Sequence, residues 1–138
     1  MPTTELSAVD NVRLMRTTFD AFNAGDLAAC TSRMASEFVI NLAGAPTRYG
    51  QDVWQQGVDI MRQGFPDMQA HIEDVFGSGD RVAMRLTFRG THTGEFQGIP
   101  ATGREVSYTS NEIYRVEDGV IAEEWICSDM AGLMAQLR

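Results

Sequence analysis

The spacing of apolar residues changes along the chain and divides it into a helical front part and a strand-rich remainder. In the front part apolar residues recur every three or four positions, as on one face of a helix. From about residue 68 apolar and polar residues alternate, as on a half-buried strand. The predicted helices cover residues 4–24, 27–34, 50–63 and 130–137. The predicted strands cover residues 37–42, 68–76, 81–93 and the two arms of a hairpin within 104–129.

The hairpin within residues 104–129 organises the rest of the prediction. Asp118-Gly119 lies between two runs that are rich in β-branched and aromatic residues, which is a strong signal for a two-residue turn. With that turn at the tip, the predicted cross-strand pairs are Val116 with Ala122, Tyr114 with Glu124, and Glu112 with Ile126. Because side chains two apart share a face of a strand, these pairs also fix the two faces of the hairpin.

Both faces of this hairpin mix polar and apolar residues. One face is predicted to carry Tyr108, Ser110, Glu112, Tyr114, Glu124, Ile126 and Ser128. The other is predicted to carry Ile113, Arg115, Ile121, Glu123, Trp125 and Cys127. A face that combines acids, phenols and apolar groups fits the wall of a cavity, but it also fits an amphipathic hairpin with one solvated face. The pattern alone leaves both interpretations open.

Several residues outside the hairpin are candidates for a pocket. Arg85 lies on the face of strand 81–93 opposite to Val82 and Met84, either in solvent or as a paired charge in a cavity. Asn41 lies among apolar neighbours and needs a hydrogen-bond partner if it is buried. Trp54 lies on the apolar side of the third helix. The apolar stripes of the helices predict packing, with some side chains available to line a pocket that a helix covers.

The order of the elements predicts an α+β fold in a single domain, residues 1–138. About three N-terminal helices are expected to pack on one face of a curved antiparallel β-sheet. A strongly curved sheet that is closed by helices encloses a cone-shaped space, so a deep central pocket is expected, suited to an apolar ligand.

Composition excludes several function classes. The net charge is −8 and all eleven basic residues are arginine, so Schiff-base lysine chemistry, a lysine base and a P-loop are excluded. The acidic balance argues against nucleic acid as a partner, and no apolar run is long enough for a membrane span. Residues 1–16 show no signal-peptide pattern, and Cys30 and Cys127 stand alone. A reduced, cytoplasmic protein is therefore expected.

The familiar cofactor and metal motifs are missing from the sequence. There is no GxGxxG after a strand, no GxSxG and no HExxH, and His71 and His92 lack the clustered partners of a zinc site. No cofactor and no metal are expected. Acid–base chemistry then depends on carboxyl groups whose burial shifts their pKa toward neutrality, and Glu112 and Glu124 are the best placed.

The chain resembles the SnoaL-like polyketide cyclases of the NTF2-like superfamily. The resemblance lies in residues 79–106, 112–125 and 128–137, in Phe65-Pro66-Asp67 and in the helix end at 22–26. The resemblance implies the α+β cone with its deep pocket. It also implies a cofactor-independent enzyme of antibiotic biosynthesis, which closes a ring of an aromatic polyketide by intramolecular aldol condensation. The implied substrate is a bulky, hydrophobic, carbonyl-containing molecule. The implied assembly is a homodimer or homotetramer formed through the outer face of the sheet.

The residues of the family pattern carry over only in part. The catalytic acid of the cyclases directly follows a tryptophan, here Trp125, so its position is held by Ile126, which cannot transfer a proton. The histidine that lies across from the acid falls at Glu112, which becomes the candidate acid–base residue. Arg85 is a candidate partner of a carboxylate or a substrate oxygen, and His92 belongs either to the cavity rim or to a structural hydrogen bond. The expected substrate-binding residues are Asn41, Trp54, Tyr108, Tyr114, Glu124 and Ile126.

Two alternatives to the aldol cyclase stay open. The first is other chemistry in the same pocket: isomerisation, epoxide hydrolysis or hydroxylation. Epoxide hydrolysis in the superfamily uses an aspartate–arginine–aspartate set, and Thr87 and Ile126 stand where acids are expected. The second is a non-catalytic ligand-binding module, which fits the loss of the family acid.

Overall fold

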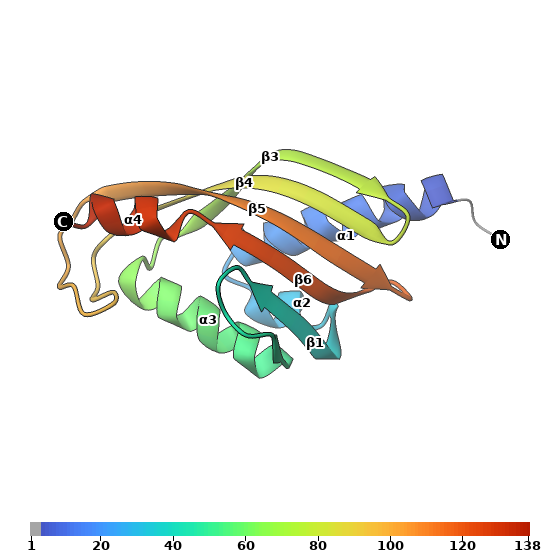
Figure 1. Cartoon of the computed structure of the whole chain (residues 1–138), viewed down its shortest axis with the longest axis horizontal. Coiled ribbons are helices and arrows are strands. Elements are labelled where there is room, and N and C mark those ends of the chain that lie inside the picture. Colours follow the sequence, from blue (N-terminus) through green and yellow to red (C-terminus); the bar gives the residue numbers. More distant parts are fainter. Residues whose placement is uncertain (1–3) are drawn as a thin grey trace.

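The computed structural model describes residues 4–138, with side chains from Ala8 onward, so the first three residues of the predicted domain lie outside it. Its elements follow the predicted order of helices and strands (Figure 1). They are α1 (Thr4–Asn23), α2 (Leu27–Thr31), β1 (Met34–Leu42), β2 (Arg48–Tyr49), α3 (Gln51–Gly64), β3 (Gln69–Ser78), β4 (Arg81–Thr91), β5 (Glu105–Glu117), β6 (Val120–Ser128) and α4 (Met130–Gln136). The largest boundary differences from prediction are at α2, which ends at Thr31, and at β1, which begins at Met34; other ends differ by one or two residues, and the short β2 was not predicted.

The strands form one curved sheet in the order β2-β1-β6-β5-β4-β3. Strands β3 to β6 are antiparallel neighbours, as predicted. The prediction of a wholly antiparallel sheet was wrong at one place, because β1 runs parallel to β6.

The helices cover the concave side of the sheet. Helix α1 packs on β3 and β4, α3 packs on β1, and α4 packs against β5 at the end of the molecule (Figure 1). The main core lies between α1, α2 and the sheet and includes Phe38, Met84 and Leu86. A second core around Phe65 and Leu133 fills the end near α4. The α+β fold is therefore confirmed.

Local chemistry explains several element ends. The Asp26 carboxylate accepts a hydrogen bond from the backbone N–H of Ala29 and caps α2. The Asp129 carboxylate accepts one from Gly132 and caps α4, as predicted. Asp118 and Gly119 both have positive φ, 51° and 77°, which a tight hairpin turn requires.

The predicted hairpin register is confirmed except near its tip. Glu112 pairs with Ile126 and Tyr114 pairs with Glu124. Val116, however, pairs with Ile121 instead of Ala122, because the register shifts between Arg115 and Val116. The extra residue in β6 turns the Ile121 side chain to the concave side, where it is fully buried, so its predicted place on the outer face was wrong.

Candidate functional site

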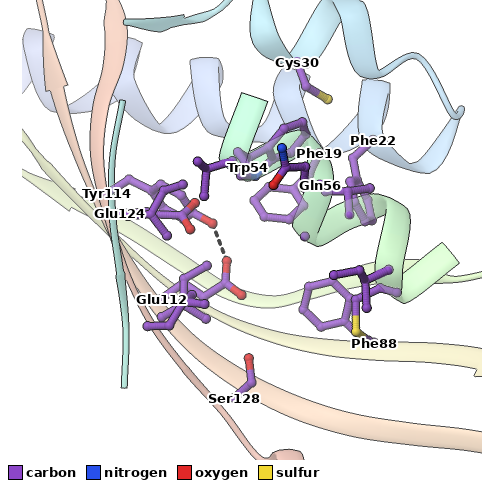
Figure 2. Close-up of a pocket in the computed structure, with 18 of the residues that line it drawn as sticks. Phe19, Phe22, Cys30, Trp54, Gln56, Phe88, Glu112, Tyr114, Glu124 and Ser128 are labelled. Atoms are coloured by element: carbon purple, nitrogen blue, oxygen red, sulfur yellow. Dashed lines mark hydrogen bonds between the residues drawn. The ribbon is translucent and has the colours of Figure 1, made fainter. Parts of the chain in front are cut away.

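A cavity of about 390 Å³ lies between the concave face of the sheet and the helices α1, α2 and α3. Figure 2 shows Glu112 and Ser128 on the sheet side of this space, with Phe19, Phe22 and Cys30 on the helix side. Most of the lining is apolar, which suits a hydrophobic ligand. The lining residues include Met15, Phe19, Phe22, Trp54, Met61, Phe88, Tyr108, Glu112, Tyr114, Ile121, Glu124, Ile126 and Ser128.

Glu112 is held in the cavity wall by a row of hydroxyl groups. Its side chain is only 3% exposed. One carboxyl oxygen accepts a hydrogen bond from the Tyr114 hydroxyl (Figure 2). The other accepts one from Ser110 Oγ at 2.7 Å. Ser128 Oγ lies 2.9 Å from Ser110 Oγ. Because the single Ser110 proton is used on Glu112, Ser128 must donate to Ser110, and the row fixes the orientation of the carboxyl group.

Glu124 lies on the same wall but without such support. It faces Tyr114 across the β5–β6 ladder and is 2% exposed. Among residues 8–138, no side chain or backbone N–H donates a hydrogen bond to its carboxyl oxygens. A buried carboxyl without donors strongly disfavours its charged form.

Burial changes the acidity of each of these groups. It raises the pKa of Glu112, although the hydrogen bonds from Tyr114 and Ser110 oppose the increase. It raises the pKa of Glu124 well above its usual value, and the nearby charge of Glu112 adds to the effect. Burial and the Glu112 charge also raise the pKa of the Tyr108 and Tyr114 phenols, so both stay protonated and available as donors.

The described part of the chain contains no cluster of three or more His, Cys, Asp or Glu side chains arranged to hold a metal ion. Within residues 4–138, none of the helices combines the length and apolar character that crossing a bilayer requires. The site therefore consists of an apolar cavity with two buried carboxyl groups and their hydroxyl neighbours.

The model of the SnoaL-like polyketide cyclases matches residues 12–137. The chain belongs to this family. Two aklanonic acid methyl ester cyclases, DauD from Streptomyces sp. (strain C5) and DnrD from Streptomyces peucetius, are each 27% identical to it over 130 residues. These alignments cover 91% of this chain, 80% of DauD and 89% of DnrD.

Solved structures of similar proteins give the same cone. IdmH from Streptomyces antibioticus, a suggested polyketide cyclase, is 36% identical with a TM-score of 0.82, and the match covers 92% of this chain and 97% of IdmH. AclR from Streptomyces galilaeus, a suggested hydroxylase, is 28% identical with a TM-score of 0.87, covering 94% of this chain and 82% of AclR. The predicted family and the NTF2-like cone are therefore confirmed.

The cavity of this SnoaL-like protein brings together most of the predicted site residues. Glu112, Trp54, Tyr108, Tyr114, Glu124 and Ile126 all line it. Their catalytic and binding roles stay predictions, because the geometry alone gives their position and surroundings.

Arg85 and Asn41 lie outside the cavity, and their predicted place in it was wrong. Arg85 points to the outer face of the sheet, because β4 turns its alternate residues Met84 and Leu86 inward. There its Nε donates to Asp74 Oδ2 at 2.8 Å, with both side chains more than half exposed. Asn41 also lies on the outer side, where its Nδ2 donates to Glu123 Oε2 at 2.9 Å and to the backbone oxygen of Glu124.

His92 lies in the second core and does not line the cavity. Its ring packs against Phe65 with the ring centroids 5.4 Å apart, and the side chain is fully buried. Its Nδ1 accepts a hydrogen bond from the backbone N–H of Thr102 at 3.2 Å and lies 2.9 Å from Thr102 Oγ1. Of the two predicted places, the structural hydrogen bond fits this geometry, and a place on the cavity rim, from which His92 was a candidate for catalysis, was wrong.

Sequence reasoning missed several residues of the site. Ser110 and Ser128 were placed on the correct face but were not recognised as supports for Glu112. The alternation of the strands, which put both serines on the same face as Glu112, could have indicated this role. Met15, Phe19 and Phe22 of α1 were assigned to packing, and they also line the cavity. Apolar periodicity alone cannot separate a core face from a cavity face, because both exclude water.

Proposed function

We propose that this chain closes a ring of a bulky aromatic polyketide by intramolecular aldol condensation, with Glu112 as its acid–base residue. The observation that supports this most is the position of the Glu112 carboxyl: buried, facing an apolar cavity, and oriented by two hydroxyl donors. The names of DauD and DnrD, two relatives that act on aklanonic acid methyl ester, favour a substrate of this class.

The proposed reaction needs no cofactor. The Glu112 carboxylate removes an activated proton from a carbon next to carbonyl groups, and the negative charge spreads over the resulting enolate. The enolate carbon attacks a second carbonyl of the same molecule, whose oxygen then takes up a proton. The apolar wall of Trp54, Tyr108 and Phe88 holds the flat molecule so that the two reacting carbons meet.

The test is ring closure of an open-ring anthraquinone keto ester, with aklanonic acid methyl ester as a second probe. Product formation is followed by absorbance and mass. We expect closure by the wild type and at least a hundredfold slower closure by Glu112→Gln. Glu117→Gln is the matched control, because Glu117 lies on the same strand with its side chain exposed. Unchanged turnover in Glu112→Gln contradicts the proposed role.

A binding module is the second outcome that this assay can detect. Trp54 lines the cavity, whereas Trp125 lies on the outer face with the Arg81 guanidinium 5.2 Å from its ring centroid. Ligand entry therefore quenches Trp54 fluorescence and leaves Trp125 unchanged. Quenching that disappears in Trp54→Phe, without ring closure, favours binding without catalysis.

We further propose a homodimer that is formed through the outer face of the sheet. Phe76 is 66% exposed there and Ile113 is also exposed, at a shallow groove that Arg85 and Asp74 share. Opposite charges in one groove suit a second copy related by a two-fold axis. Phe76→Arg is expected to give monomers in sedimentation analysis. Ile60→Arg, at an exposed position of α3, is expected to leave the assembly unchanged. An unchanged mass for Phe76→Arg contradicts this interface.

A further inference from the structure

We propose that the two buried carboxyl groups have separate tasks: Glu112 accepts the proton from carbon, and Glu124 delivers a proton to the carbonyl oxygen under attack. The assignment rests on the proposed function and deepens it. The sequence placed Glu124 beside Glu112 as a candidate for acid–base chemistry and for substrate binding but gave it no separate task, and the family's own acid position is Ile126.

The first support is the contrast in hydrogen bonding. Glu112 accepts from Ser110 and from Tyr114, so both carboxyl oxygens have donors that stabilise a negative charge. Glu124 is equally buried and lines the cavity, and within residues 8–138 nothing donates to its carboxyl. An O–H donor that is itself unpartnered and faces a ligand cavity is available to a substrate oxygen.

The second support is the coupling between the two groups. The charge of Glu112 raises the pKa of Glu124, in addition to the larger effect of burial. If two nearby buried carboxyl groups both ionise, their negative charges repel each other strongly, so one proton remains with the pair. The hydroxyl donors favour charge on Glu112, which leaves the proton on Glu124.

The surrounding groups do not cancel this arrangement. From β5, Tyr108 and Tyr114 face the pair as neutral phenols. From α2, burial raises the pKa of Cys30, so it faces the cavity as a thiol. Arg62 and Arg48 also line the cavity, but among the described residues neither forms an ion pair with Glu112 or Glu124.

The proposed step balances. The Glu112 carboxylate takes a proton from the carbon acid, and the electrons of the broken C–H bond form the enolate. The enolate carbon forms the new C–C bond, and the π electrons of the attacked carbonyl move to its oxygen. That oxygen takes the proton of Glu124, which becomes a carboxylate. A proton then returns from Glu112 to Glu124 through water in the emptied cavity, and the pair is reset.

The position of Glu124 has a consequence for the substrate. Glu124 and Ile126 lie two residues apart on one face of β6, which separates their side chains by roughly 7 Å along the strand. The carbonyl that receives the proton is therefore expected to lie beside Tyr114 and Ile121, nearer the hairpin tip than the acid position of the family pattern.

Infrared spectroscopy of protein labelled with ¹³C at the glutamate carboxyl tests the proton assignment without any substrate. At pH 7 the wild type is expected to show one protonated glutamic acid band, which is lost in Glu124→Gln and kept in Glu112→Gln and Glu117→Gln. In Glu112→Gln the band should titrate at lower pH, because the neighbouring charge is gone. A band that is lost in Glu112→Gln and kept in Glu124→Gln overturns the assignment.

Isotope exchange then separates the two tasks during catalysis. The open-ring anthraquinone keto ester is incubated in D₂O, and deuterium uptake at its acidic carbon is followed by mass. Glu124→Gln is expected to keep exchange within about threefold of wild type and to slow ring closure at least a hundredfold. Glu112→Gln is expected to lose both. Loss of exchange in Glu124→Gln, or normal closure by it, overturns the proposal.

The two experiments fail in different ways. If the wild type closes neither probe, the aldol function is contradicted, and the infrared result still decides which carboxyl holds the proton. If closure occurs but both variants lose exchange and closure alike, the aldol function stands and the separate tasks are rejected.

Discussion

Glu123 and Glu124 are consecutive residues of β6, and the sheet places them in opposite environments. The Glu123 carboxyl on the outer face accepts hydrogen bonds from Arg115 at 3.2 Å and from Asn41 at 2.9 Å. The Glu124 carboxyl on the concave face is 2% exposed and accepts none from residues 8–138. One side of the sheet compensates an acid with a cation, and the other keeps an acid without a counter-ion.

The outer face repeats this pairing elsewhere, since Arg85 pairs with Asp74 and Arg115 also pairs with Glu117. Such exposed pairs contribute little to stability. The concave face instead supplies hydroxyl donors to Glu112 and nothing to Glu124. The acids of the outer face thus have cationic partners, and those of the concave face, which we propose take part in proton transfer, have none among residues 8–138.

The largest expected effect comes from removing both inner acids. Glu112→Gln and Glu124→Gln are each expected to slow ring closure by about 10²–10⁴-fold. The double variant is expected to be about as slow as the slower single variant, because groups that act in one reaction are not additive. Single-turnover closure of the keto ester measures this, and rate losses that multiply contradict a joint role.

The next effect concerns stability. The pKa of Glu124 is raised above its ordinary value of 4.5, so the folded state keeps a proton that the unfolded state releases as pH rises past 4.5. This contribution to stability is present at low pH and is lost with rising pH, until the folded state also releases the proton.

Glu124→Gln removes this pH dependence. Its gain in unfolding free energy over wild type is therefore expected to grow between pH 5 and pH 8. Urea unfolding at the two pH values measures it, with Glu117→Gln as control. A gain that is independent of pH contradicts a buried, protonated Glu124.

A smaller effect should follow from moving the acid along the strand. In the Glu124→Gln background, Ile126→Asp restores a carboxyl at the position of the family acid. We expect about a tenfold recovery of ring closure. The recovery is limited because the substrate binds with its carbonyl oxygen next to position 124 and not next to position 126. Recovery to the wild-type rate contradicts the importance of the Glu124 position, whereas the absence of any recovery contradicts the expectation that an acid at position 126 reaches the carbonyl oxygen.

The smallest effect is expected on the outer face. Arg85→Met breaks an ion pair whose partners are 52% and 58% exposed, so stability should change by no more than about 0.5 kcal/mol. Ring closure should be unchanged, because Arg85 is on the far side of the sheet. Thermal unfolding and the closure assay test this, and a tenfold slower reaction contradicts the separation of the two faces.

The sequence predicted the geometry of the hairpin because local rules govern it. Asp118-Gly119 fixed the turn, and the period of two placed Glu112, Tyr114 and Glu124 on one face. The same rule had put Arg85 opposite to the buried Met84, and the pocket role carried over from the family ran against that pattern. Local alternation was the better guide here.

Other features could not be read from local pattern. The bulge that turns Ile121 inward depends on one extra residue in β6, and the sequence pattern of neither β5 nor β6 predicts this bulge. His92 is buried through a contact with Thr102, which comes from a loop. The partner of Asn41 lies on a strand from the other end of the chain. Each of these depends on tertiary packing, which the period of the sequence does not contain.

The parallel pairing of β1 with β6 has a consequence for the order of folding. On one edge β1 pairs with the short β2, but on its other edge it pairs only with the last strand, where Asn41 lies beside Trp125. Until β6 is synthesised, the apolar residues Phe38 and Ile40 of β1 lack the neighbouring strand that completes the sheet beside them. Pairing across such a long stretch is intrinsically slow. The cavity wall is therefore expected to be completed only once β6 has left the ribosome.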